Sequence, residues 1–306
     1  MSAIKNLVSE IVDYAGLFPP AKLPLDVVTE NYEHYLGSSS RWMLARLIIP
    51  AGRLIELEKQ PSFTNSSHHW KISSLVPEVN AEADAFSVAM RAIDDFNSRH
   101  EDTGRAVVDA IEVKASSTES IEKTIAQIPE TINAFWELPH QQDPDELVKA
   151  IAGGPDNIFA KIRTGGVTTN LIPPADQVAR FIARCAQYDV GFKATAGLHH
   201  PIRGNYRLTY ETDADCGNMF GFVNVFVAAA FAFAGQDEAF LAKVLSETEA
   251  TNFEVSEDAI VWNGNSISSD QISTLRNQRA ISFGSCSFAE PTEELSQLGW
   301  INIEVA

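Results

Sequence analysis

The sequence contains few cysteines and few basic residues, and both shortages exclude classes of protein. Three cysteines among 306 residues, none in a CxxC pair, are too few and too scattered for a disulfide framework. Lysine and arginine together number 23 against 41 acidic residues, which gives a formal net charge of −18. Because this charge repels phosphate backbones and anionic membrane surfaces, we expect no nucleic acid and no membrane as a partner.

We also expect no secretory signal, and the sequence contains no long apolar run. Its first residues, MSAIKNLVSEIVDY, contain no basic stretch followed by an apolar segment. The longest apolar stretch, 219–235, contains Asn224 and many small residues and is shorter than the ~20 residues of a spanning helix. We therefore expect a cytoplasmic protein that binds a small-molecule substrate, and the sequence leaves a homo-oligomer open. Asn224 is interpreted as a core amide bonded to backbone, with a reach into the pocket as the alternative.

Short β-branched and apolar runs alternate with segments of helical periodicity, which is typical of a parallel sheet covered by helices. The runs that predict strands are 10–14, 42–49, 70–76, 106–113, 132–138, 158–163, 190–195 and 280–284. Eight strands favour a TIM (β/α)8 barrel over a doubly wound open sheet, which shows the same alternation. Because no repeat or linker divides the chain, we predict a single barrel domain over residues 1–306. A helical and hairpin excursion at about 200–278 is inserted between strands 7 and 8.

Charged residues at the ends of two neighbouring strands are the main functional signal. The active site of a barrel lies at the C-terminal ends of its strands. A period of two places Lys161 and Arg163 on one face of the sixth strand, and Lys193 and Thr195 on one face of the seventh. Since the alternate positions of both strands are apolar and suit contact with helices, we expect these four side chains to point into the barrel.

The pairing of Lys161 with Lys193 suggests covalent chemistry. Two desolvated lysines that repel each other favour a neutral amine on one of them, as an imine-forming nucleophile requires. The alternative is that both lysines form ion pairs with Glu112 and Glu137 in the barrel mouth.

Four short motifs occur in order at strands 1, 6, 7 and 8. They are DYAGLFP at 13–19, KIRTG at 161–165, KATAG at 193–197 and FGSCS at 283–287. These motifs resemble those of the deoxyribose-phosphate aldolases, which are class I, Schiff-base aldolases. The resemblance covers the four motifs and not the rest of the chain.

The resemblance implies catalytic roles for residues of this chain. Lys161 would form the Schiff base, Lys193 would lower its pKa, and Glu112 would assist proton transfer, without a cofactor. Asp13, in the first motif, is a further catalytic candidate. The turns after strands 7 and 8 bind substrate phosphate in that family, and backbone donors in such turns suit an anion. This implies substrate binding by Gly197, Gly284 and Ser285.

Several residues depart from the family pattern. Arg163 stands where the family has a small hydroxyl residue, and its guanidinium suits a substrate carboxylate or phosphate, or a contact with Glu137. Glu137 adds an acid on the fifth strand, while His199 and His200 follow the seventh. Adjacent histidines on an extended segment point in opposite directions, so we expect no metal site built from both.

Together these residues predict an aldolase-like lyase for a small, anionic carbonyl compound. The predicted substrate-binding residues are Arg163, Glu137, Thr195, Gly197, His199, His200, Gly284 and Ser285. One alternative is a metal-dependent lyase, isomerase or hydrolase that uses Glu112, Glu137 and one of the two histidines. Another is a non-catalytic barrel that binds an anionic metabolite. Cys286 is interpreted as a small residue in the eighth turn.

Overall fold

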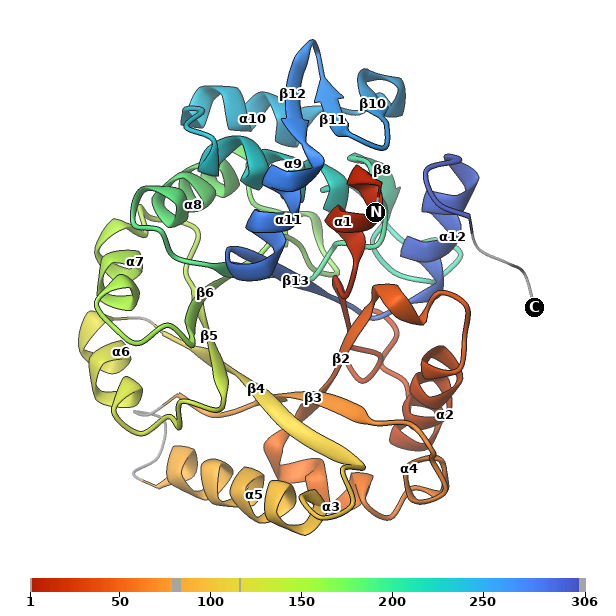
Figure 1. Cartoon of the computed structure of the whole chain (residues 1–306), viewed down its shortest axis with the longest axis vertical. Coiled ribbons are helices and arrows are strands. Elements are labelled where there is room, and N and C mark those ends of the chain that lie inside the picture. The colour runs from red at the N-terminus through yellow and green to blue at the C-terminus, as the bar shows by residue number, and fades with distance from the viewer. Residues whose placement is uncertain (1, 79–83, 116, 303–306) are drawn as a thin grey trace.

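Eight parallel strands close into a barrel in the order β1-β13-β7-β6-β5-β4-β3-β2, and Figure 1 shows helices surrounding it. This computed structural model describes residues 2–78, 84–115 and 117–302, so the predicted domain range of 1–306 extends outside the described residues. The barrel strands are β1 (Val12–Tyr14), β2 (Leu44–Pro50), β3 (Trp70–Leu75), β4 (Ala106–Lys114), β5 (Asn133–Leu138), β6 (Ile158–Arg163), β7 (Phe192–Thr195) and β13 (Ala280–Ser285). The architecture is consistent with a TIM barrel, and the open doubly wound alternative is wrong.

The strands β1, β2, β5 and β7 begin one or two residues later than the sequence predicts, and for β1 and β7 the reason is backbone geometry. Glu10 has a φ of 45° and Asp189 a φ of 56°, both in the left-handed region, which no strand residue adopts. Val190 instead donates its N–H to the carbonyl of Cys185 at 2.8 Å and so ends the preceding helix. The strands that follow these turns therefore start at Val12 and Phe192.

Amphipathic helices cover the outside of the barrel. In α8, the buried residues Val178, Phe181, Ile182 and Cys185 repeat at three and four positions, as one buried face requires. The helices outside the segment between β7 and β13 are α1 (Ala3–Val8), α2 (Leu25–Leu36), η1 (Arg41–Met43), η2 (Ala51–Arg53), α3 (Leu54–Leu57), α4 (Pro61–Thr64), α5 (Ala85–His100), α6 (Thr118–Ile125), α7 (Asp145–Ala152), η3 (Thr169–Leu171), α8 (Ala175–Gln187) and α12 (Ala289–Gln297).

Between β7 and β13 the chain forms two small antiparallel sheets and further helices. These elements are β8 (Gly204–Arg207), β9 (Cys216–Met219), α9 (Phe222–Phe233), α10 (Glu238–Ser246), η4 (Ala250–Asn252), β10 (Phe253–Val255), β11 (Ala259–Trp262), β12 (Asn265–Ser268) and α11 (Ser269–Gln278). The hairpin expected near Trp262 joins β11 to β12, and Asn263 and Gly264 both take a positive φ in its turn. The β8–β9 pair was not predicted, because its short, glycine- and asparagine-containing strands have low β propensity.

Helix α9 is apolar on every side because it is packed on every side. It contacts α8, α10, α11 and β13 (Figure 1), and Phe222 stacks on Phe283 with ring centroids 5.0 Å apart. Asn224 donates to the carbonyls of Val244 and Glu247 at 2.8 and 2.9 Å, which confirms its interpretation as a core amide. In the described part of the chain, no helix is both long enough and apolar enough to cross a membrane.

Candidate active site

The strand register places the predicted charged residues side by side inside the barrel. Lys161 on β6 is level with Lys193 on β7 and with Glu137 on β5. Asp13, Glu112, Lys161 and Lys193 are all almost completely buried. These four residues and Glu137 form what we call the charge network.

Lys193 lies at the buried end of the charge network. Its Nζ is 2.6 Å from Asp13 Oδ2 and 2.7 Å from Glu112 Oε1. Ser282 donates to the same Asp13 oxygen at 2.6 Å, and Ser73 donates to the same Glu112 oxygen at 2.8 Å. Both carboxylates are therefore held by a cation and a hydroxyl, as buried charges require.

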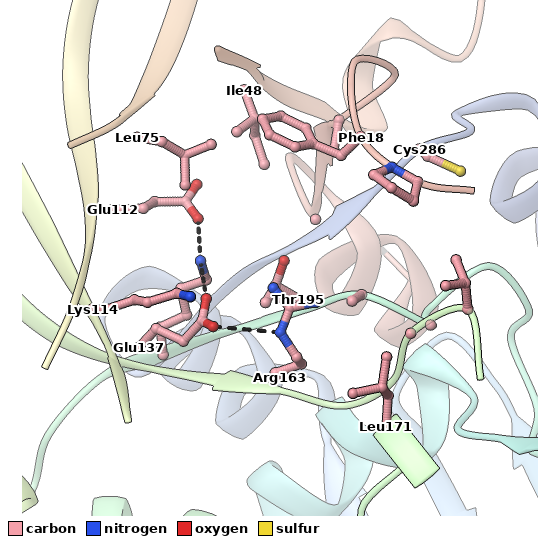
Figure 2. A pocket seen from close by; sticks show the side chains of 18 of the residues that line it. Phe18, Ile48, Leu75, Glu112, Lys114, Glu137, Arg163, Leu171, Thr195 and Cys286 are labelled. Atoms are coloured by element: carbon pink, nitrogen blue, oxygen red, sulfur yellow. Dashed lines mark hydrogen bonds and ion pairs between the residues drawn. The ribbon is translucent and has the colours of Figure 1, made fainter. Parts of the chain in front are cut away.

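Lys161 lies between two carboxylates. Its Nζ is 2.8 Å from Glu112 Oε2 and 2.7 Å from Glu137 Oε2, while Glu137 Oε1 is 3.4 Å from Arg163 Nε. Figure 2 shows these contacts as a chain that runs from Glu112 to Arg163. Glu112 thus bridges the two lysines, and Arg163 ends the chain at a half-exposed position.

The ion pairs decide the protonation of Lys161. Burial by itself lowers the pKa of Lys161, but Glu112 and Glu137 raise it above its ordinary value. Burial opposes ionisation of Glu112 too, yet the two lysines hold the pKa of this carboxyl well below its usual range. The pKa of Glu137 is also lowered, against the effect of burial, mainly by Lys161. This arrangement contains the ion pairs of the alternative interpretation and favours a protonated Lys161, whereas a neutral amine on one of the two lysines stays a prediction.

A cavity of about 590 Å³ opens above the charge network at the C-terminal ends of the strands. The predicted site residues that line it are Glu112, Glu137, Lys161, Arg163, Thr195, Gly197, His199 and Gly284. Lys193 and Asp13 lie beneath it and reach it through Glu112. Ser285 is buried and accepts a hydrogen bond from the N–H of Ser287 at 3.3 Å, so its hydroxyl is engaged in its own turn.

The predicted glycine turns are tightly packed at the edge of this cavity. Gly197 has a φ of 73°, and a Cβ added there would meet the Cα of Gly165 at 2.9 Å. A Cβ at Gly284 would meet Thr195 Oγ1 at 2.9 Å. The close approach of the loops after β6 and β7 thus requires glycine at position 197, while Gly284, within β13, makes room for the Thr195 side chain of β7. Phosphate binding by the same turns stays a prediction.

The two histidines are each paired with a carboxylate of α12. His199 Nδ1 is 2.8 Å from Glu290 Oε2, and His200 Nδ1 is 2.7 Å from Glu294 Oε1. His199 lines the main cavity, whereas His200 lines a neighbouring one and stacks on Tyr206. Among the described residues, no three His, Cys, Asp or Glu side chains are grouped so that they could hold a metal ion. Although His199 lines the same cavity as Glu112 and Glu137, neither described histidine is grouped with these two carboxylates so that they could hold a metal ion.

Lys114 and Cys286 also line the cavity, and neither was predicted as a site residue. Lys114, the last residue of β4, is an exposed cation, and its place at a strand end was the available signal. Cys286, directly after β13, has its Sγ 3.9 Å from His199 Nε2. The sequence shows the thiol in the FGSCS motif, but the contact with His199 depends on the folded loop after β7.

Comparisons with known protein families, with curated proteins and with solved structures found no match. The resemblance to deoxyribose-phosphate aldolases therefore rests on the four sequence motifs and stays a prediction. The geometry of the cavity and of the charge network beneath it is the basis for a functional proposal.

Proposed function

We propose that this protein is a class I aldolase-like lyase that cleaves or forms a carbon–carbon bond in a small, anionic carbonyl compound. The position of Lys161 carries the proposal. Of the two buried lysines only Lys161 lines the cavity, and its Nζ lies between the two carboxylates of Glu112 and Glu137. Such an amine has a proton acceptor within reach on either side.

The reaction begins with loss of a proton from Lys161. Glu137 is the better acceptor, because Glu112 Oε1 already binds Lys193 and Ser73. The free amine then attacks the substrate carbonyl carbon, and the carbinolamine loses water to give an imine. Glu137 gives its proton to the departing water and then accepts the proton of the substrate's β-hydroxyl as the neighbouring carbon–carbon bond breaks and its electron pair forms an enamine. Glu137 next protonates the enamine carbon, and water hydrolyses the resulting iminium, which releases the product and free Lys161. Lys193 keeps Glu112 ionised next to the cationic intermediate.

The cations at the mouth of the cavity fit an anionic substrate. The Arg163 side chain is 41% exposed, and its one contact with a carboxylate of the described residues is the long one with Glu137 at 3.4 Å, so most of its donors can turn to a ligand. Lys114 lines the same cavity from the end of β4. A carboxylate or phosphate bound there would direct the carbonyl end of the substrate toward Lys161.

The expectations from the sequence for domain organisation, cellular location and substrate class fit this proposal. We infer a single (β/α)8 domain with an insertion between its seventh and eighth strands, in which Leu208 and Met219 contribute to the cavity wall. We also infer a cytoplasmic location and a small-molecule substrate.

Reductive trapping tests the proposal. Sodium borohydride is added to the protein with acetaldehyde or with pyruvate, and the modified peptide is identified by mass spectrometry. We expect an adduct on Lys161 that is absent in Lys161→Arg, since arginine keeps the positive charge between the carboxylates but forms no imine. Lys114 lines the same cavity and serves as an internal control. Adducts on Lys114 alone, or none with any carbonyl compound, would contradict the proposal.

A second candidate is a non-catalytic barrel that binds an anionic metabolite. The raised pKa of Lys161 favours it, because a protonated lysine clamps an anion without covalent chemistry. The same experiment separates the two functions. Calorimetric binding of pyruvate that requires Arg163, together with no trapped adduct, would favour this second candidate.

A further inference from the structure

A second group of reactive side chains lies on the wall of the cavity. Cys286 lines the cavity beyond the end of β13, and its Sγ is 3.9 Å from His199 Nε2. The other ring nitrogen, Nδ1, is 2.8 Å from Glu290 Oε2. One imidazole thus connects a thiol to a carboxylate through its two nitrogens, which is the order of a nucleophile, its base and the group that orients the base.

The surroundings of His199 hold this geometry in place. The imidazole is buried, and Tyr210 donates its hydroxyl to the same Glu290 oxygen at 3.1 Å. The Tyr210 oxygen is also 3.5 Å from Cys286 Sγ. Burial lowers the pKa of His199, but Cys286 and Glu290 raise it to about 9. A proton is therefore held on the ring next to the sulfur at neutral pH.

The other two cysteines have different surroundings. Cys185 is buried on the apolar face of α8, and burial raises the pKa of its thiol. Cys216 is exposed on β9. The chain therefore contains a buried and an exposed thiol with which the reactivity of Cys286 can be compared.

We propose that Cys286, His199 and Glu290 form a nucleophilic thiol centre that adds to small aldehydes in the cavity. The thiol proton of Cys286 passes to His199 Nε2, the sulfur forms a bond to the carbonyl carbon, and the π electrons move to the oxygen, which takes that proton from His199. The product is a thiohemiacetal, and its formation needs no oxidant, reductant or cofactor. Tyr210 donates its hydroxyl to Glu290 and so helps to hold the carboxylate that orients His199.

Figure 2 shows Cys286 away from Glu112 and Glu137, with Thr195 between them in this view. The cavity therefore has two reactive sides, the amine of Lys161 and this thiol. The thiol centre does not depend on imine formation, so its test is independent of borohydride trapping.

Alkylation by iodoacetamide tests the thiol centre in the full-length protein. The sulfur displaces iodide, and peptide mass spectrometry follows each cysteine separately at pH 7. We expect Cys286 to react faster than Cys216 and Cys185 to stay unmodified. The rate at Cys286 should fall about tenfold in His199→Gln, while the rate at Cys216 stays unchanged. Acetaldehyde should slow alkylation of Cys286 and not of Cys216.

A second variant guards against misfolding of His199→Gln, because His199 is buried. Glu290→Gln removes the carboxylate from a partly exposed position and keeps a similar shape. It should slow alkylation of Cys286 about threefold or more, since the imidazole loses its charged partner. Equal rates at Cys286 in the wild type and in Glu290→Gln would overturn the proposal. So would a wild-type Cys286 that reacts more slowly than Cys216, or one that acetaldehyde does not protect.

Discussion

The charge network and the thiol centre line the same cavity but are built differently. In the charge network, Glu112 has short contacts on both oxygens, and Lys193 is completely buried between two carboxylates. The thiol centre has one long contact of 3.9 Å, and the side chain of its carboxylate, Glu290, is about one-third exposed. Charge is thus concentrated in short ion pairs beneath the cavity, where Asp13 Oδ1 is a buried oxygen without a hydrogen-bond partner, whereas charge is sparse on the wall.

This difference teaches how stability and reactivity are divided in the molecule. Buried ions cost free energy to desolvate, so removal of one partner leaves the others with an uncompensated penalty. We expect substitutions in the charge network to destabilise the fold. Substitutions in the thiol centre should mainly change reactivity, apart from the buried His199, whose protonation is coupled to folding.

The largest loss of unfolding free energy is expected for Lys193→Met. Methionine fits the space but leaves Asp13 and Glu112 without their shared cation, which should cost about 3–5 kcal/mol of unfolding free energy. Urea denaturation, followed by circular dichroism, measures the unfolding free energy of the wild type and of this variant.

Lys123→Met is the matched control for Lys193→Met. Lys123 forms an exposed i,i+4 pair with Glu119, and loss of such a pair should cost about 0.5 kcal/mol or less. Similar costs for both variants would show that the charge network does not stabilise the fold as the comparison requires.

A smaller, pH-dependent contribution to the free energy of unfolding is expected from His199. Its folded-state pKa of about 9 lies above the ordinary value of 6.5, so protonation stabilises the folded state. The contribution is fully present below about pH 6.5 and is lost as the pH rises through about 9. The difference in unfolding free energy between wild type and His199→Gln should shrink by about 3 kcal/mol from pH 6 to pH 10. Urea denaturation at several pH values checks this, and a constant difference would contradict it.

The barrel could be predicted from the sequence because its signals are local. The apolar runs and the periodicity of α8 predict parallel strands alternating with helices, and the period of two in β6 predicts Lys161 and Arg163 on one face. Since parallel strands align their ends, Lys161, Lys193, Glu112 and Glu137 could also be expected at one end of the barrel.

The protonation of Lys161 and the thiol centre could not be predicted in the same way. The pKa of Lys161 depends on two distances, to Glu112 and to Glu137, that a strand pattern does not contain. The contact of Cys286 with His199 joins residues 87 positions apart through the loops after β7 and β13. Loop conformation has no short-range periodicity, so Cys286 was interpreted only as a small residue.

Arg163 links the charge network to the mouth of the cavity, and its substitution should have the smallest effect on stability. Its only ion pair, among the described residues, is the 3.4 Å contact with Glu137, so Arg163→Gln should cost less than about 1 kcal/mol of unfolding free energy. The half-exposed guanidinium can offer paired donors to an anion, which a glutamine amide cannot replace. We therefore expect about tenfold weaker binding of inorganic phosphate or pyruvate, measured by calorimetry.

Arg180→Gln on α8 is the control, because Arg180 pairs loosely with Glu238 at 3.8 Å and does not line the cavity. Unchanged anion affinity in Arg163→Gln would mean that Arg163 only positions Glu137, and the anion would then have to bind elsewhere in the cavity, with Lys114 as the next cation to test.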